Sequence, residues 1–177
     1  MFQTPQADAL VDYNLAVMQQ ALDLLSGFDT VGRRRHYEAA VGPHLRHVYE
    51  HYDAFLNGLE NGLVDYDARP REVLMEVDAD VASARLRRLL VRLRALDAQA
   101  IDADIAVVQF GGLGGEQRLV IPSSASRELM FLASHAIHHY AVLRPVLTEL
   151  GFQLQADFGK APATVRHERE QLRNTAA

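Results

Sequence analysis

Apolar side chains recur at steps of three and four residues in four stretches of the chain, and this spacing constrains the fold more than any other feature. In the first stretch the recurring residues are Val11, Leu15, Met18, Leu22 and Leu25. Such steps place side chains on one face of an α-helix, and that face must be buried against other elements. The spacing predicts helices over about residues 6–26, 41–58 (or to 63), 78–97 and 124–150.

Two β-prone runs lie between the third and fourth predicted helices. Residues 104–110 and 116–121 flank the glycine-rich stretch 111–115, a pattern that predicts a β-hairpin. No Gly-Lys-Ser/Thr follows the glycines, which argues against a phosphate-binding loop. The predicted fold class is therefore all-α: an antiparallel four-helix bundle with a small β-hairpin between helices 3 and 4, in a single domain of residues 1–177.

The other segments are predicted to be connections. The stretch from Gly27 to Gly32 ends the first helix, and Arg33, Arg34 and Arg35 open a solvated loop. Residues 61–70 read as a polar connection with turn residues at both ends. The tail from Gly151 through His167 contains further glycines and prolines and shows no helical repeat before the last residues of the chain, so it predicts an ordered strap instead of a helix.

Composition excludes several kinds of function. No apolar run reaches the roughly 18 residues of a membrane span, and the first residues lack the layout of a secretory signal, so we expect a cytoplasmic protein without a membrane partner. Cysteine is absent, which excludes thiolate ligands and leaves any thiol to a cosubstrate. The net charge of −5 argues against binding to nucleic acid.

Most of the histidines are concentrated in two predicted helices. They are His44, His47 and His51 in the second helix and His135, His138 and His139 in the fourth. His135 and His139 are one turn apart and point the same way, whereas His138 lies about 100° from His139. Imidazole is the commonest metal ligand, and a shared metal relieves the cost of burying neighbouring imidazoles. The pair predicts half of a metal site, completed by one histidine of the second helix.

The ligand from the second helix cannot be chosen by spacing alone. An ideal helical wheel places His44 and His51 nearer the apolar seam than His47. The chain has neither the His-Glu-x-x-His motif of zinc proteases nor the Glu-x-x-His repeat of di-iron bundles, so a mononuclear divalent ion is favoured.

Three motifs resemble the DinB-like superfamily of metal-dependent four-helix-bundle enzymes. They are His-x-Arg-His-x-x-x-His from His44, Ser-x-x-x-Arg-Glu-Leu leading into Ser-His-x-x-His-His-Tyr, and Phe-Gly-x-Ala-Pro-Ala-Thr-x-Arg from Phe158. The resemblance implies up-down-down-up connectivity, a homodimer and a divalent ion, with Zn, Ni or Fe expected. It maps the metal ligands onto His47, His135 and His139, with His44 and His51 as alternates.

The resemblance also implies an activity. Its characterised members include thiol-dependent isomerases and S-transferases, so the expected function is a metal-dependent thiol S-transferase or hydrolase that acts on a small electrophile. The expected partner is a small-molecule substrate or a low-molecular-weight thiol. The alternatives are a non-catalytic metal-binding bundle and a stress-associated binding module. Candidates to orient the imidazoles or bind an anionic group are Tyr49, Arg46, His138 and Tyr140.

Overall fold

The computed structural model describes residues 5–28 and 31–175. Residues 1–4, whose sequence argues against a secretory signal, lie outside this part. So do residues 29 and 30 of the predicted turn after the first helix. Among the described helices, none combines the length and the apolar character that a bilayer span requires.

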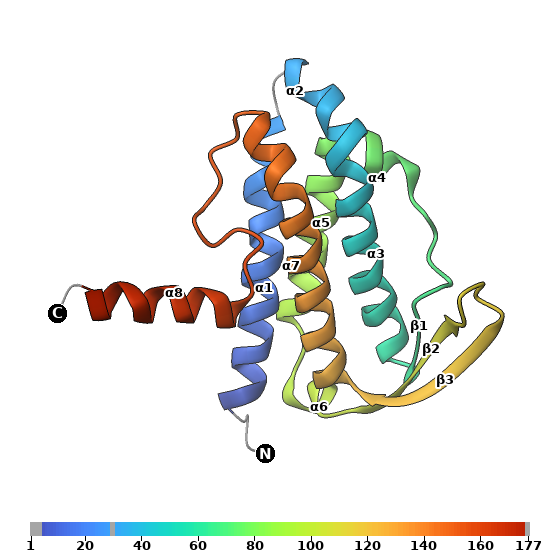
Figure 1. The fold of residues 1–177 in the computed structure, drawn as a ribbon. Helices are drawn as coiled ribbons and strands as arrows, with labels where there is room; N and C mark the ends of the chain where they lie inside the picture. Colours follow the sequence, from blue (N-terminus) through green and yellow to red (C-terminus); the bar gives the residue numbers. More distant parts are fainter. Residues whose placement is uncertain (1–4, 29–30, 176–177) are drawn as a thin grey trace.

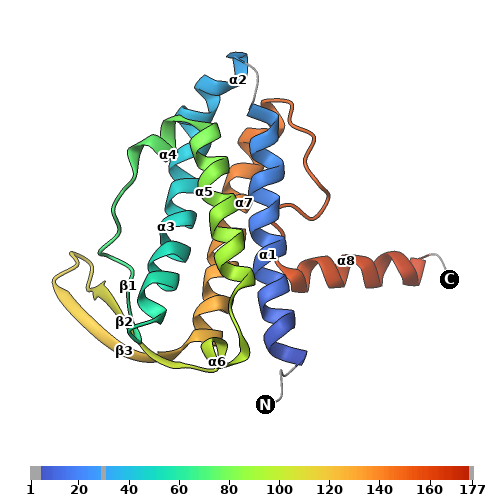
Figure 2. The ribbon, with the colours of Figure 1, turned by 180° about the vertical axis from the view of Figure 1, so that it is seen from behind.

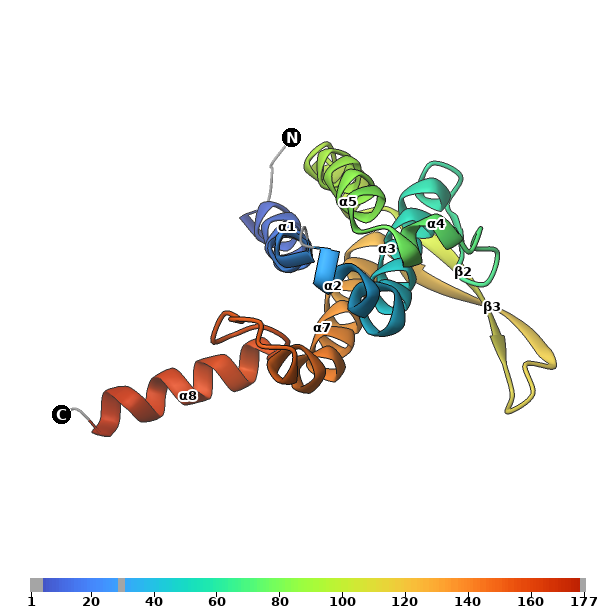
Figure 3. The same ribbon diagram turned by 90° about the horizontal axis from the view of Figure 1, so that it is seen from above.

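Four long helices lie side by side and form the body of the molecule (Figures 1 and 2). They are α1 (Pro5–Leu25), α3 (Gly42–Leu59), α5 (Ala79–Arg94) and α7 (Ala125–Glu149). Each matches one predicted helix to within a few residues at either end. In Figure 1, α1 and α7 run upward and α3 and α5 run downward. α1 packs against α5 and α7, and α3 packs against the same two helices, so α1 and α3 occupy opposite corners (Figure 3).

The helix ends follow from local chemistry. The side chain of Asp78 accepts hydrogen bonds from the backbone N–H groups of Asp80 and Val81 and caps α5. Ser124 caps α7 in the same way by accepting from the N–H of Arg127. Pro43 lies in the first turn of α3, where its missing N–H leaves no bond unmade.

The all-α class predicted for this fold is wrong, because the described part of the chain also forms a three-stranded mixed sheet, and the fold is a mixture of α and β. Its strands, in spatial order, are β1 (Leu63–Asp65), β2 (Asp104–Gly111) and β3 (Gln117–Ser124). β2 and β3 form the antiparallel hairpin that the sequence predicts. β1 pairs in parallel with β2, in a register that places Val64 opposite Val107. This strand arises from the predicted polar connection, where three residues are too few to show an alternating pattern.

The tail departs from the prediction as well. Residues 151–161 are non-helical, as the predicted strap requires, but α8 (Pro162–Thr175) begins within the last part of that region and continues beyond it. It projects away from the four long helices in Figures 1 and 3. Its charged side chains pair along the helix, as Arg166 does with Glu170. None of its residues is buried, so it has no apolar seam that could reveal it in the sequence.

Short helical turns join the larger elements. They are η1 (Ser26–Phe28), α2 (Val31–His36), the π-helical turn η2 (Tyr37–Val41), α4 (Val73–Val77) and α6 (Ala98–Ile101). The arginine run that reads as a loop therefore lies in α2. Gly42, where η2 meets α3, lies so close to α4 that a Cβ there would be 1.8 Å from the backbone oxygen of Glu76. Glycine thus permits the close approach of α4 to the first turn of α3.

Candidate metal centre

Histidines from α3 and α7 meet where these two neighbouring helices face each other. His47, His135 and His139 each offer one ring nitrogen, and these three nitrogens lie within 4.8 Å of one another. The ring centroid of His47 lies 5.0 Å from that of His135 and 4.8 Å from that of His139. The three predicted ligands are therefore brought together, close enough to hold a metal ion. A set of three imidazoles fits a borderline divalent ion such as Zn.

His139 is the centre of a chain of imidazole contacts. Its Nδ1 lies 2.8 Å from Nδ1 of His44, and its Nε2 lies 3.0 Å from Nε2 of His135. When His139 donates its Nδ1 proton to His44, its Nε2 carries the lone pair and faces His135. His44, a predicted alternate ligand, is thus placed to hold the tautomer and the ring orientation of His139.

His51, the second alternate, is fixed by its own helix. Its Nδ1 lies 2.7 Å from the backbone oxygen of His47, and a carbonyl oxygen only accepts, so Nδ1 carries the proton. The lone pair of its neutral ring is then on Nε2. The ring is buried and stacks on Tyr66, with its centroid 4.5 Å from that of His135. His51 is therefore the nearest candidate for an additional ligand beside the three that converge.

Burial and mutual repulsion keep these imidazoles neutral. The pKa of His47 is lowered to about 3 and those of His139 and His51 to about 4, and desolvation by burial is the largest cause in each case. Neighbouring imidazoles and the Arg69 guanidinium are the other causes of the low pKa of His47. The pKa values of His44 and His135 are lowered by burial and by His138. Neutral imidazole is the form that binds a metal.

A buried carboxylate belongs to α3 itself, in the same stretch as its histidines. Glu50 is fully buried and accepts hydrogen bonds from Nη1 of Arg46 at 2.9 Å and from the backbone N–H of Glu72 at 2.7 Å. Arg46 also pairs with Glu76 of α4. A buried charge is tolerable only when it is paired and hydrogen-bonded, and Glu50 meets both conditions. This network fixes the segment before α4 against α3.

Aromatic rings and a second buried carboxylate close the side of the site next to β1. The ring of Phe131 stacks on His135 at 5.5 Å between centroids, and it also contacts Tyr66. The Tyr66 hydroxyl donates to Oε2 of the buried Glu128 at 2.9 Å, and the Ser123 hydroxyl donates to Oε1 at 2.6 Å. These bonds fix the apolar wall on which His51 and His135 rest.

The residues predicted to support the imidazoles have other roles. His138 is exposed, and among the described contacts its ring approaches that of His139 at 5.7 Å. Tyr140 is buried and stacks on Phe158, and within the described residues its hydroxyl has no hydrogen-bond partner. Arg46 forms its ion pair within α3 with Glu50.

Sequence reasoning missed Arg69 and Tyr66, which contact the imidazoles, and Glu50, which pairs with the neighbouring arginines. Glu50 lies between His47 and His51 in the sequence, and this position could have indicated that its side chain belongs near the site. Arg69 lies in the predicted polar connection, and no local pattern distinguishes it from a solvated arginine. Tyr66 follows the unpredicted strand β1. The last two reach the site only through tertiary structure.

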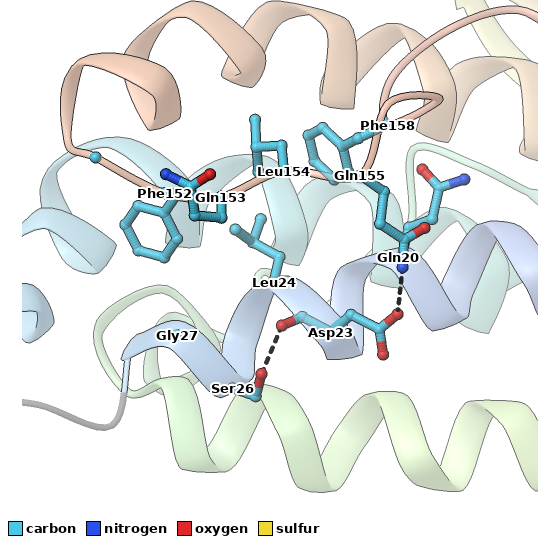
Figure 4. A pocket seen from close by; sticks show the side chains of 11 residues that line it. Gln20, Asp23, Leu24, Ser26, Gly27, Phe152, Gln153, Leu154, Gln155 and Phe158 are labelled. Carbon is cyan, nitrogen blue, oxygen red and sulfur yellow. Dashed lines mark hydrogen bonds between the residues drawn. The ribbon is translucent and has the colours of Figure 1, made fainter.

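A cavity elsewhere in the molecule contains no histidine. It has a volume of about 470 Å³ and lies between the end of α1 and the connection from Gly151 to Phe158. Figure 4 shows Asp23 between Gln155, whose Nε2 donates to its carboxylate at 3.2 Å, and Ser26, whose hydroxyl donates to its backbone oxygen. Apart from the Asp23 carboxylate, the lining is amide, hydroxyl and apolar, so it offers no cluster of metal ligands.

Comparison with known proteins shows a distant similarity and does not place the chain in a family. No family model matches the chain, and no solved structure matches it. The chain is similar to FK506-binding protein 5 of Rhizopus delemar, with 25% identity over 157 residues. The similar region covers 89% of this chain but 37% of that protein, so the chain spans little more than a third of the relative's length. The DinB-like resemblance stays a prediction.

Proposed function

We propose that the chain binds one divalent metal ion through His47, His135 and His139. The observation that carries this proposal is the convergence of three imidazole nitrogens within 4.8 Å on rings that burial keeps neutral. Zn, Ni and Fe are the ions that such a nitrogen set suits. Because each helix presents its histidines from a rigid backbone, the set needs little reorganisation to accept an ion.

The ion's role in this proposal is catalysis of thiol transfer to, or hydrolysis of, a small electrophilic molecule. A divalent ion in such a site supplies Lewis acidity, which acidifies a water or a thiol and polarises an electrophile. Three protein ligands leave room for a small molecule. His44 supports this role by holding the Nδ1 proton of His139, and Phe131 supports it by excluding water from one side of His135.

A second candidate is a non-catalytic metal-binding protein, and the position of His51 favours it. The Nε2 lone pair of His51 lies on a ring whose centroid is 4.5 Å from that of His135. If His51 also binds the ion, four protein ligands close the site, as in structural zinc sites. A binding module that sequesters a ligand under stress would be compatible with either arrangement.

The Rhizopus relative does not choose between these candidates. Its name describes a protein of which the similar region is 37%, and the name carries no statement about this region. A homodimer and a cytoplasmic location belong to the same proposal and rest on the sequence alone.

Metal analysis of untagged protein tests the site directly. Protein purified without added metal should contain close to one equivalent of a divalent ion. The His139→Ala variant should contain none, because it loses the nitrogen at the centre of the contact chain. His138→Ala is the matched control, since it removes an exposed imidazole one residue away. Unchanged metal content in a variant with alanine at positions 47, 135 and 139 would show the assignment to be wrong.

Cobalt substitution separates the two candidates. In an open site, low-molecular-weight thiols should change the visible spectrum of the cobalt protein, because they occupy a free coordination position. A spectrum that stays the same across thiols and small anions would favour the non-catalytic protein. In that case, His51→Ala should restore the response to thiols.

A further inference from the structure

The side chain of Arg69 packs against the histidine cluster and is largely shielded from solvent. It lies in the connection between β1 and α4, and its side chain is only 16% exposed. Its Nε donates to the backbone oxygen of Tyr66 at 2.5 Å. Its Nη1 lies 3.0 Å from Nδ1 of His47 and 3.3 Å from Nδ1 of His51. Because Nδ1 of His51 already donates to a backbone oxygen, the bond that Arg69 makes is the one to His47.

This bond has a consequence for metal binding. A guanidinium can only donate, so Nδ1 of His47 accepts and uses the single lone pair of the neutral ring. A metal ion needs that same lone pair, or needs the ring in the other tautomer, whose Nδ1–H would face the N–H of Arg69. The bond from Arg69 and the use of His47 as a ligand therefore exclude each other.

Two acceptors near Arg69 can hold its guanidinium when the hydrogen bond to His47 breaks. The backbone oxygen of Tyr66 still accepts from Nε, and Glu50 lies 3.7 Å from Nη1. Glu50 is already engaged by Arg46 and by the N–H of Glu72. The three converging imidazoles are neutral, so a divalent ion beside Arg69 leaves positive charge in excess. An anionic group on the incoming molecule would balance it.

We propose that Arg69 is the residue that selects an anionic ligand for the metal site: it holds His47 in the metal-free protein and, once released, binds a carboxylate on the small molecule that approaches the ion. This inference rests on the proposed function and names the class of its substrate or thiol. Arg69 thereby links the entry of metal to the recognition of a carboxylate.

A zinc titration of the apo protein tests the release of Arg69. The Arg69→Met variant should bind zinc about tenfold more tightly than the wild type in a calorimetric titration, because it lacks the competing donor and its charge. Arg71→Met is the matched control, since Arg71 is an exposed arginine of the same connection, and its zinc affinity should stay within about twofold. Equal or weaker zinc binding by Arg69→Met would overturn the inference.

A pair of thiols tests the recognition of the carboxylate. Mercaptoacetate and mercaptoacetamide carry the same thiol, and only the first carries a carboxylate. The ratio of their affinities for the cobalt protein, followed by its visible spectrum, should fall about tenfold in Arg69→Met and should be unchanged in Arg71→Met. Comparing the ratio between proteins removes the intrinsic difference between the two thiols. A ratio that persists in Arg69→Met would overturn the inference.

These outcomes remain distinct from a failure of the proposed function. If the wild type binds no zinc, or if His139→Ala binds it as well, the metal site itself is wrong. If zinc binds at the histidines and both Arg69 measurements are unchanged, only the role of Arg69 is wrong. If circular dichroism shows that Arg69→Met does not fold, Arg69→Gln serves instead, because it keeps a polar side chain without the charge. Its thiol ratio should also fall.

Discussion

The α1–α5 interface and the α3–α7 interface lie on opposite sides of the same group of helices, and they differ in what they bury. The buried side chains of α5 are all apolar, and α1 buries Asn14, which accepts from the Tyr52 hydroxyl and donates to the backbone oxygen of Leu10. By contrast, α3 and α7 bury Glu50, His51 and Glu128 and bring further histidines together at the partly buried candidate site.

This difference separates an interface of apolar side chains from one that contains candidate metal ligands. Burying imidazoles at a helix interface forgoes the stabilisation that apolar side chains would give there. The α1–α5 interface supplies that stabilisation, and the α3–α7 interface holds the groups that can bind an ion. Three predictions can break or sharpen this comparison.

The largest expected effect is on the apolar side. Leu89 of α5 is 1% exposed, and Leu89→Ala should lower the free energy of unfolding by about 2–5 kcal/mol, because it removes buried methyl groups and leaves a cavity. Its zinc affinity should be unchanged. Val91→Ala on the exposed face of the same helix is the control and should change stability by less than about 0.5 kcal/mol. Urea denaturation measures the stability of both variants. A loss of zinc binding in Leu89→Ala would show that the two interfaces are coupled.

The effect of acid should be smaller and confined to the histidine side. A histidine whose pKa is lowered on folding stays neutral in the folded state while the unfolded chain takes up a proton below its ordinary pKa of 6.5. Stability is therefore retained above about pH 6.5 and falls as the pH drops toward the values of about 3 and 4 for His47 and His139.

Each such histidine removes at most about 1.4 kcal/mol per pH unit, and less here because solvent screens half-buried rings. Between pH 7 and 5, apo His47→Gln should lose about 1 kcal/mol less than the wild type in urea denaturation. His138→Gln, at an exposed position, should follow the wild type. Equal acid sensitivity in His47→Gln and the wild type would contradict the burial of a neutral imidazole.

The smallest expected effect on stability comes from His135→Leu. Leucine restores an apolar contact with Phe131 in place of an imidazole that needs a partner, so the free energy of unfolding should stay within about 1 kcal/mol of the apo wild type. The same variant should lose stoichiometric zinc binding. A destabilisation above about 2 kcal/mol would mean that the cluster has a structural role, and the contrast between the two interfaces would weaken.

The sequence predicted those parts of the fold that repeat along the chain. The seam from Val11 to Leu25 predicted α1, and the glycine-rich turn predicted the β2–β3 hairpin, because both patterns are local. β1 and α8 were not predicted, since one is too short and the other has no buried face. Both errors concern elements whose existence depends on neighbours or on charge pairs and not on an apolar repeat.

The candidate site likewise contains residues that local spacing predicted and residues that it did not. His135 and His139 followed from their spacing on one helix. The wheel favoured His44 and His51 over His47, whereas the structure brings the ring nitrogen of His47 to the pair, because packing of α3 against α7 also covers the flank of the seam. The roles of Arg69 and Glu50 depend on how the connection after β1 folds over α3, which no spacing encodes.

The parallel pairing of β1 with β2 anchors the connection that carries Arg69. Tyr66 donates its backbone N–H to Val108, so the connection that carries Arg69 is attached through residues that follow α5 in the chain. A three-residue strand opens at a small cost in free energy. Amide hydrogens at β1 should accordingly exchange with solvent while those in the middle of α7 are still protected. Arg69 can thus leave the histidines without any of the long helices unfolding.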